Sequence, residues 1–432
     1  MKFKTKLIAF SILSVLIISV SISVLLIKFD YQANYIKYKD QFNTKVFPIF
    51  NLLPDKIKST LMIWSGKRSF KNLFNDYNVK FLPETQYLNI DFKKFQTSFD
   101  KSISLRFFIE IYGDNLILAS YSGEFYRANI LDLKKENINK ISEKIISNNL
   151  KKDNEKFAIN DILVIDDKIF VVKSDEHNIK NNNCGKLEIY YSSIDTIFNF
   201  NHFKTLDGCA GLGLFAGGMQ KYNFNNKPGI LISTVSSGNN KTKSASQNDN
   251  SIFGKMIFVD LDTKEVTRIS KGHRNPQGLA VKDNIILSTE HGPKGGDEIN
   301  KIIYGKNYGW PISSYGLPYK NEKNIKFNKS HEDKGFEEPV YVFLSAVGIS
   351  ELIFLPNSFH ADWKDNVIVS SLNGRSIFRI KFSDKNYDKV IYVEKIFIGE
   401  RIRDIKYSVN QNLIVLALED TGVVGILDVK NN

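Results

Sequence analysis

The chain has 432 residues, of which 42% are hydrophobic, and it carries a formal net charge of +12. This length and apolar content allow one large folded domain with a small appendage. The positive charge is spread along the chain, and no Lys/Arg cluster interleaved with aromatic residues occurs in it. We therefore predict that the protein does not bind nucleic acid.

The first 28 residues have the pattern of a membrane anchor. Three lysines precede the uncharged run 7–27, and Lys28 follows it. At about 1.5 Å per residue, a helix of this length spans the hydrocarbon core of a bilayer. The basic flank predicts a cytoplasmic N-terminus. Residues 21–24 make a poor signal-peptidase site, which favours an uncleaved signal-anchor over a cleaved signal peptide. We thus predict a single-pass protein of the inner or cytoplasmic membrane whose C-terminal domain lies in the periplasm or exterior.

Residues 29–104 mix lysines, aspartates and aromatic residues at loosely helical spacing. Pro48, Pro54 and Pro83 interrupt this spacing, and proline ends or kinks a helix. The segment is therefore predicted to be a short, partly helical stalk between the membrane and the main domain.

The chain has two cysteines, Cys184 and Cys209. Outside the cytoplasm a disulfide between them is the expected state, and two separate buried thiols are the alternative. Two cysteines alone provide too few ligands for a structural metal site.

From about residue 105 onward, short β-branched runs alternate with tight turns. Divided by six, residues 105–432 give a little over 50 residues per unit, the size of a four-stranded propeller blade. This periodicity favours an all-β, six-bladed β-propeller over a large β-sandwich. The six repeated segments are 115–130, 162–173, 230–236 with 255–260, 279–303, 353–380 and 402–427.

One low-complexity segment, residues 236–250, is rich in Ser, Asn and Lys. Such a composition offers little apolar area to bury. We predict that this segment is a mobile surface loop at a blade edge.

A dense set of turn-forming and polar residues lies between two apolar runs, which is typical of a rigid loop that carries a functional site. The motifs are Gly272-His-Arg-Asn-Pro-Gln-Gly-Leu279, Glu290-His-Gly-Pro293, Asp297-Glu-Ile-Asn300 and Gly305-Lys-Asn-Tyr-Gly-Trp-Pro311. They resemble the signature of the glucose/sorbosone dehydrogenase family. The resemblance covers about residues 105–430 and implies a six-bladed propeller. Several members of that family bind pyrroloquinoline quinone (PQQ) and oxidise sugars.

Four polar residues match the positions that contact the cofactor in this family: Arg274, Asn275, Arg401 and Arg403. Arginine offers a planar fork of donors that suits carboxylates, and asparagine offers both a donor and an acceptor. Alternation along a strand places Arg401 and Arg403 on one face, where they repel unless an anion or a carboxylate lies between them. The resemblance therefore implies a PQQ site, whereas pairing with carboxylates of neighbouring blades is the alternative.

The resemblance also implies calcium. The turn at Gly292-Pro293 leaves carbonyl oxygens free, and Ca²⁺ prefers oxygen ligands. In the family these two carbonyls would hold the Ca²⁺ that polarises the quinone. Glu298 and the carbonyl of Tyr308 match positions that hold a second, structural Ca²⁺ in some members. For Glu298, an ordinary turn carboxylate is the alternative.

The sequence departs from the family where proton transfer is expected. Sugar oxidation needs a general base for the hydroxyl proton, and Phe215 stands where the family has the catalytic His. Met219 stands in place of an Arg, Ser236 in place of the Asp that supports the His, and Asn373 in place of a Lys. His202 substitutes for the base only if the alignment gap is placed differently.

Two functions therefore remain open. The first is a membrane-anchored, outward-facing dehydrogenase that oxidises an aldose sugar with PQQ and Ca²⁺ and passes electrons to an unknown acceptor. The second is a non-catalytic propeller that recognises a glycan or a protein, with Phe215 in place of the base.

Overall fold

The computed structural model describes residues 89–100, 102, 104–150, 157–177, 184–210, 216–236, 245–319 and 326–430. The predicted anchor (1–28), most of the predicted stalk (29–104) and Phe215 lie outside these residues, as do the side chains of Cys184 and Cys209. The anchor, the helical stalk and the disulfide therefore stay predictions. In the part of the chain that the structure describes, no helix has the length and apolarity needed to cross a membrane.

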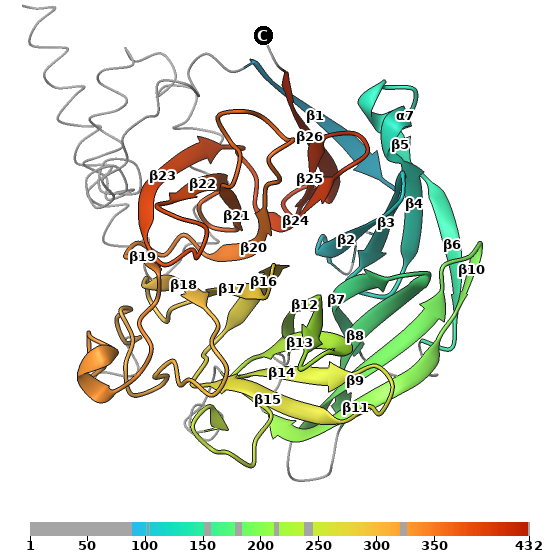
Figure 1. The fold of residues 1–432 in the computed structure, drawn as a ribbon. Helices are drawn as coiled ribbons and strands as arrows, with labels where there is room; N and C mark the ends of the chain where they lie inside the picture. Colours follow the sequence, from blue (N-terminus) through green and yellow to red (C-terminus); the bar gives the residue numbers. More distant parts are fainter. Residues whose placement is uncertain are drawn as a thin grey trace, which may run out of the picture. The chain divides into compact units, whose positions relative to one another are not determined.

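The described strands form six sheets of four or five strands each, arranged around a centre (Figure 1). Each of the six repeated segments falls in a different sheet, so the predicted six-bladed β-propeller is confirmed. Blade 1 contains β2 (Phe107–Tyr112), β3 (Asn115–Ser120), β4 (Phe125–Asn129), β6 (Glu143–Asn148) and β10 (Ile197–Asn199). Blade 2 contains β7 (Phe157–Ile165), β8 (Lys168–His177), β9 (Cys184–Ser193) and β11 (Asn201–Ala210). Blade 3 contains β12 (Ala216–Phe224), β13 (Lys227–Thr234), β14 (Lys255–Asp260) and β15 (Val266–Lys271).

The remaining three blades repeat this order. Blade 4 contains β16 (Pro276–Lys282), β17 (Ile285–Glu290), β18 (Asp297–Lys301) and β19 (Tyr341–Phe343). Blade 5 contains β20 (Ile349–Phe354), β21 (Val367–Ser371), β22 (Ser376–Phe382) and β23 (Val390–Phe397). Blade 6 contains β24 (Ile402–Ser408), β25 (Leu413–Leu418), β26 (Val423–Lys430), β1 (Asn89–Thr97) and β5 (Lys140–Ile141). The short helices are α7 (Ile130–Lys134) and η3 (Glu332–Lys334).

Blade 6 joins strands from both ends of the described chain. Strand β1 pairs antiparallel with β26 from Asn89↔Lys430 to Gln96↔Val423. This pairing closes the ring of blades and leaves β26 without a free edge. The propeller therefore includes residues 89–97, which we predicted from the sequence to belong to the lead-in.

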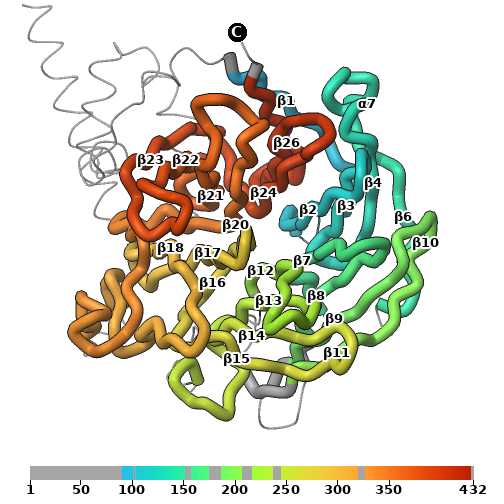
Figure 2. Tube along the Cα trace, viewed as in Figure 1, coloured from blue at the N-terminus to red at the C-terminus, as the bar shows by residue number. Residues whose placement is uncertain are grey.

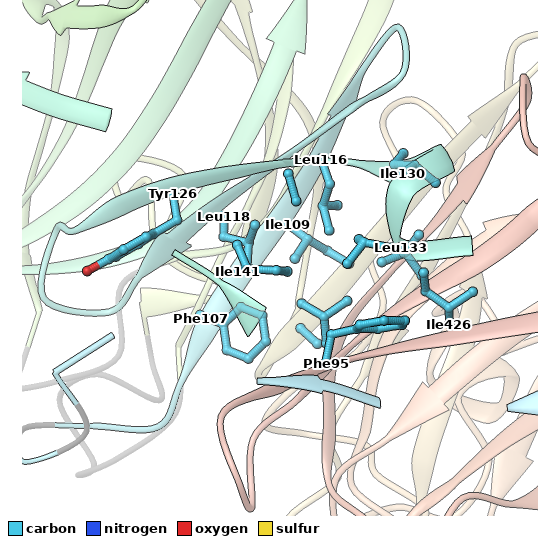
Figure 3. Close-up of a cluster of buried hydrophobic side chains, with 14 of the residues drawn as sticks. Phe95, Phe107, Ile109, Leu116, Leu118, Tyr126, Ile130, Leu133, Ile141 and Ile426 are labelled. Carbon is cyan, nitrogen blue, oxygen red and sulfur yellow. The ribbon is translucent and has the colours of Figure 1, made fainter. Parts of the chain in front are cut away.

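The hydrophobic core lies between neighbouring blades. Between blades 1 and 6, Phe95 and Ile426 pack against Phe107, Leu116 and other buried apolar side chains of blade 1 (Figure 3). Because each blade packs on a neighbour at both faces, strands such as β25 are buried along their whole length. Such strands are continuous apolar runs without polar alternation.

One strand from each blade lies nearest the centre: β2, β7, β12, β16, β20 and β24 (Figures 1 and 2). In all of these except β2, the pairing with the next strand is irregular near the start of the inner strand. A bulge re-aims the side chains beside it. Four of the inner strands, β7, β16, β20 and β24, place polar residues on the lining of a central cavity.

Candidate functional site

The central cavity has a volume of about 240 Å³. Its lining comes from all six blades: Arg106, Phe108, Asn160, Asp161, Gly217, Gly218, Val235, Asn275, Gln277, His291, Ser350, Glu351, Leu372, Arg401, Arg403 and Asp404. A cavity with mixed apolar and polar lining at the convergence of all blades is the expected place for a small-molecule site. Three of the four predicted cofactor residues, Asn275, Arg401 and Arg403, line it.

Three arginines on this cavity share one carboxylate, and we call them, with Glu419, the arginine wall. Arg403 Nε donates to Glu419 Oε2 at 2.6 Å, and Arg401 Nη2 donates to Glu419 Oε1 at 3.4 Å. Arg106 Nε lies 3.9 Å from Glu419 Oε2. Burial, together with repulsion from Arg106 and Arg401, lowers the pKa of Arg403 to about 10, so it stays charged at neutral pH. The wall carries a net charge of +2, from three guanidiniums and one carboxylate.

Three carboxyl groups on the same cavity, Asp161, Glu351 and Asp404, form what we call the carboxylate ring. Each accepts a main-chain N–H from the inner strand of an adjacent blade. The bonds are Met219 N to Asp161 (2.6 Å), Leu279 N to Glu351 (3.0 Å) and Ile109 N to Asp404 (2.8 Å). The ring therefore ties neighbouring blades together at the centre.

One buried lysine, Lys406, neutralises part of the ring. Its Nζ lies 3.5 Å from Glu110 Oε2 and 3.9 Å from Asp404 Oδ1. Burial raises the pKa of Asp161 to about 8 and raises that of Glu351 well above its usual range. Although burial opposes it, the attraction of Glu110, Asp404 and the other carboxylates raises the pKa of Lys406. The ring thus holds protons at neutral pH and Lys406 keeps its charge.

The fourth predicted cofactor residue, Arg274, lies beside the central cavity and lines a smaller one of about 10 Å³. Its Nη1 donates to the His291 carbonyl at 2.8 Å, and its Nη2 donates to the Tyr319 hydroxyl at 3.4 Å. The guanidinium carbon lies 5.2 Å from the centre of the Trp310 ring, which is a cation–π distance. Among the described residues, the buried Nε of Arg274 has no hydrogen-bond partner. The Arg274 side chain is thus held in place, while its Nε–H donor lacks an acceptor.

His291 orients the second residue of the Arg274-Asn275 pair. Its Nδ1 lies 3.3 Å from Asn275 Nδ2, and its Nε2 bonds to the Ile349 carbonyl. Burial, Arg403 and Arg274 lower the pKa of His291 to about 3, so the imidazole is neutral. A neutral ring that donates from Nε2 accepts at Nδ1 from the Asn275 amide. This arrangement leaves Asn275 Oδ1 as an acceptor, which takes a bond from Gln277 Nε2 at 3.0 Å.

The predicted calcium loop, Gly292-Pro293, is tightly folded. Gly292 N donates to Asp297 Oδ1 at 3.0 Å, and burial raises the pKa of Asp297 to about 6. A Cβ on Gly292 would lie 2.1 Å from the Gly295 oxygen and 2.4 Å from the Gly296 oxygen, so only glycine fits there. Carbonyl oxygens crowd this loop, and oxygen donors are the ligands that Ca²⁺ takes. The donor chemistry fits a calcium ion, and the ion itself stays a prediction.

The predicted second calcium site contains a histidine. Glu298 is buried, accepts from Asn300 Nδ2 at 3.3 Å, and lies 3.6 Å from His331 Nε2. The His331 ring stacks on Tyr315 with the ring centres 5.3 Å apart. Glu298 and Tyr308 do line one small cavity, but no group of three His, Cys, Asp or Glu side chains among the described residues is placed to hold a metal. A carboxylate and a main-chain carbonyl are both ligands that Ca²⁺ takes, and the second ion stays a prediction.

Three other residues considered at the departures from the family, His202, Ser236 and Asn373, do not line the central cavity. His202 is exposed, its Nε2 lies 2.8 Å from Thr205 Oγ1, and it does not line the cavity. Ser236 is buried, and Asn373 is exposed. Because Phe215 lies outside the described residues, the substitution at the base position stays a sequence observation. Among the described residues, His291 is the histidine that reaches the cavity, and both of its nitrogens are engaged.

Sequence reasoning missed Arg106, Glu419 and the carboxylate ring. Arg106 and Asn275 each come directly before an inner strand, and Asp161 and Asp404 each end the irregular pairing of one. A search for polar residues that precede each repeated apolar run could have found them. Glu419 follows β25, so its meeting with the arginines depends on tertiary structure alone.

Comparison with known proteins agrees with this architecture. Residues 226–425 match the family described as Glucose / Sorbosone dehydrogenase. Aldose sugar dehydrogenase YliI of Escherichia coli (strain K12) is 34% identical over 157 residues, which cover 35% of this chain and 41% of that protein. The match therefore spans less than half the length of that relative.

Two solved structures show the same fold. A crystal structure of glucose dehydrogenase superposes with a TM-score of 0.65 at 18% identity, covering 79% of this chain and 100% of the other. The PQQ-bound form of aldose sugar dehydrogenase from Streptomyces coelicolor superposes with a TM-score of 0.56 at 16% identity, covering 79% of this chain and 99% of the other. At these identities the likeness concerns the fold alone.

Proposed function

From residue 226 to residue 425 the chain belongs to the glucose/sorbosone dehydrogenase family, and on that premise we propose that it is a PQQ-dependent dehydrogenase of a small sugar. The arginine wall is the observation that carries this proposal. Its net charge of +2 lies on a cavity of about 240 Å³ at the centre of the blades. An excess of positive charge on the lining of a cavity suits an anionic ligand, and PQQ bears three carboxylates.

The residues present fit such a cofactor. Arg401 and Arg403 would pair with its carboxylates, and Asn275 would face its carbonyl groups. The unpaired Nε of Arg274 offers a further donor beside the cavity. When bound, PQQ would supply a two-electron acceptor for the hydride of the sugar, and Ca²⁺ on the 292–293 carbonyls would polarise it. These residues would bind and orient the cofactor, and His291 keeps the Asn275 amide in one rotamer.

Oxidation of a sugar hydroxyl also releases a proton, and the described cavity residues that accept one are carboxylates. Asp161 lines the cavity, and burial raises its pKa to about 8. A pKa near the working pH suits a proton acceptor. We place the released proton on the ionised fraction of the carboxylate ring; because burial raises the pKa of Asp161 to about 8, this fraction grows as the pH rises toward 8, and turnover should rise with it.

The neutral, fully engaged His291 favours one second candidate, a non-catalytic propeller that binds a glycan or a protein. With a pKa of about 3 and both nitrogens bonded, this imidazole is a poor base. In that reading the arginine wall recognises an anionic group and no oxidation follows.

We further propose, for either function, that residues 7–27 tether the propeller to the outer face of the cytoplasmic membrane.

Calorimetric titration of the full-length chain with PQQ, first in Ca²⁺ and then in chelator, tests the dehydrogenase. We expect tight binding in Ca²⁺ that weakens in chelator, and Arg403→Gln should weaken it at least tenfold. Arg375→Gln is the matched control, because Arg375 pairs with Asp420 at 3.0 Å and does not line the cavity. Turnover of aldoses with an artificial electron acceptor should follow. No binding at high micromolar PQQ would exclude the dehydrogenase and leave the binding propeller.

A further inference from the structure

Arg106 extends the arginine wall from a different blade. It precedes β2 in blade 1, whereas Arg401 and Arg403 lie at the start of β24 in blade 6. Its main chain is fixed at both ends, since its N–H donates to Ser104 Oγ at 3.1 Å and its carbonyl accepts from Tyr121 N at 2.9 Å. The guanidinium carbon lies 5.2 Å from the centre of the Tyr121 ring. Arg106 is therefore presented to the cavity from a defined position.

The charge of Arg106 is the least compensated in the wall. Glu419 forms hydrogen bonds with Arg403 and Arg401, whereas its nearest oxygen lies 3.9 Å from Arg106 Nε, beyond hydrogen-bond length. The side chain of Arg106 is 39% exposed, the most open of the three. A guanidinium that is partly open, held in place and short of a partner is suited to pair with a carboxylate or phosphate of a ligand.

The surfaces beside Arg106 suit a sugar ring. Phe108 follows it on β2 and contributes an aromatic ring to the cavity lining. Asn160, on the adjacent inner strand β7, contributes an amide whose Nδ2 is bonded to Ala158 and Ser174. An amide oxygen is an acceptor and suits a sugar hydroxyl as its donor. An apolar face, an amide and a guanidinium lie on one cavity.

We propose that Arg106 is a specificity-determining residue that pairs with an anionic group of the sugar. The substrate class is then sugars that bear a carboxylate or a phosphate, in preference to neutral aldoses. This inference rests on the proposed function, because it assigns Arg401 and Arg403 to the cofactor and leaves Arg106 for the substrate.

The experiment is calorimetric titration of the full-length chain with D-glucuronate, D-glucose 6-phosphate and D-glucose, each with and without PQQ and Ca²⁺. We expect at least one anionic sugar to bind about tenfold or more tightly than glucose. Arg106→Gln should remove this preference, so that neither anionic sugar binds more tightly than glucose, and Arg106→Lys should retain part of it. Arg127→Gln is the control, because Arg127 pairs with Glu143 on the outer strands of blade 1. The first two ligands distinguish a carboxylate from a phosphate.

Three results would overturn the inference. They are glucose binding as tightly as both anionic sugars, no measurable binding of either anionic sugar, and an Arg106→Gln variant that loses PQQ affinity but keeps the preference. Thermal unfolding of each variant verifies that it folds. PQQ binding without any preference among sugars would reject this inference alone. A preference for anionic sugars without PQQ binding would reject the proposed dehydrogenase and retain the role of Arg106.

Discussion

The arginine wall and the carboxylate ring line the same cavity, yet their charges are satisfied in opposite ways. Each carboxyl of the ring accepts a main-chain N–H of an adjacent blade and lies near the buried Lys406. The three guanidiniums of the wall share a single carboxylate, Glu419. The ring is complete without a ligand, whereas the wall is not. A buried carboxyl that accepts backbone N–H groups ties neighbouring blades together, whereas guanidiniums in excess of their carboxylate partners on a cavity mark a binding site.

The arginine wall and the carboxylate ring meet on one strand. Arg403 and Asp404 are consecutive on β24, and both line the cavity. Because the pairing of β24 with β25 is irregular between Ile402 and Asp404, both side chains can reach the same space. At the start of β24, Asp404 thus stabilises the fold and the neighbouring Arg403 contributes to ligand binding.

The largest expected effect comes from breaking the ring. Asp404→Ala leaves Ile109 N and Ile405 N without their acceptor and removes one partner of Lys406. We expect the free energy of unfolding to fall by about 2–4 kcal/mol. Arg401→Ala, its counterpart in the wall, should cost less than about 1 kcal/mol, since Arg401 is partly exposed. Thermal unfolding of both variants measures the difference, and equal losses would contradict the division between ring and wall.

A smaller effect should come from removing the one carboxylate of the wall. Glu419→Gln leaves three guanidiniums without a counter-charge, so the ligand-free protein should lose about 1–3 kcal/mol of stability. An added anion such as citrate should restore part of this loss. The midpoint of thermal unfolding in increasing citrate, for variant and wild type at one ionic strength, tests this expectation. Equal gains in both proteins would show that the wall does not select anions.

The sequence predicted the blades well because their signal is local. Each of the six repeated segments contains its own strands and turns, so reading them requires no knowledge of distant residues. The closing strand β1 was missed because its partner, β26, lies more than 300 residues away in the chain. Composition also misled at Ser246, in the segment predicted to be a mobile loop. Ser246 is buried and its hydroxyl donates to the Trp310 carbonyl at 2.7 Å.

The site was predictable only in part, for a similar reason. Asn275, Arg401 and Arg403 belong to motifs that are contiguous in sequence, and the structure brings them to one cavity. Glu419 and Arg106 are not part of any motif, and only the packing of blades 1 and 6 brings them within ion-pair distance. Likewise, His331 is distant in sequence from Glu298, so its place beside that carboxylate could not be inferred.

The smallest effect concerns the proton that the ring holds. Burial raises the pKa of Asp161 from 3.8 to about 8, so the folded state keeps a proton that the unfolded state releases above about pH 4. The stabilisation is complete below that pH and is lost as the pH rises toward 8. In Asp161→Asn this residue does not titrate.

We therefore expect the stability of the wild type, relative to Asp161→Asn, to fall by about 1 kcal/mol between pH 5 and pH 8. The fall is smaller than for an isolated group with this pKa, because Asp161, Glu351 and Asp404 titrate together. Unfolding of both proteins across this range measures it. Parallel curves would show that Asp161 is ionised throughout. The ring would then be as strongly charged as the wall, and backbone hydrogen bonds alone would distinguish the two.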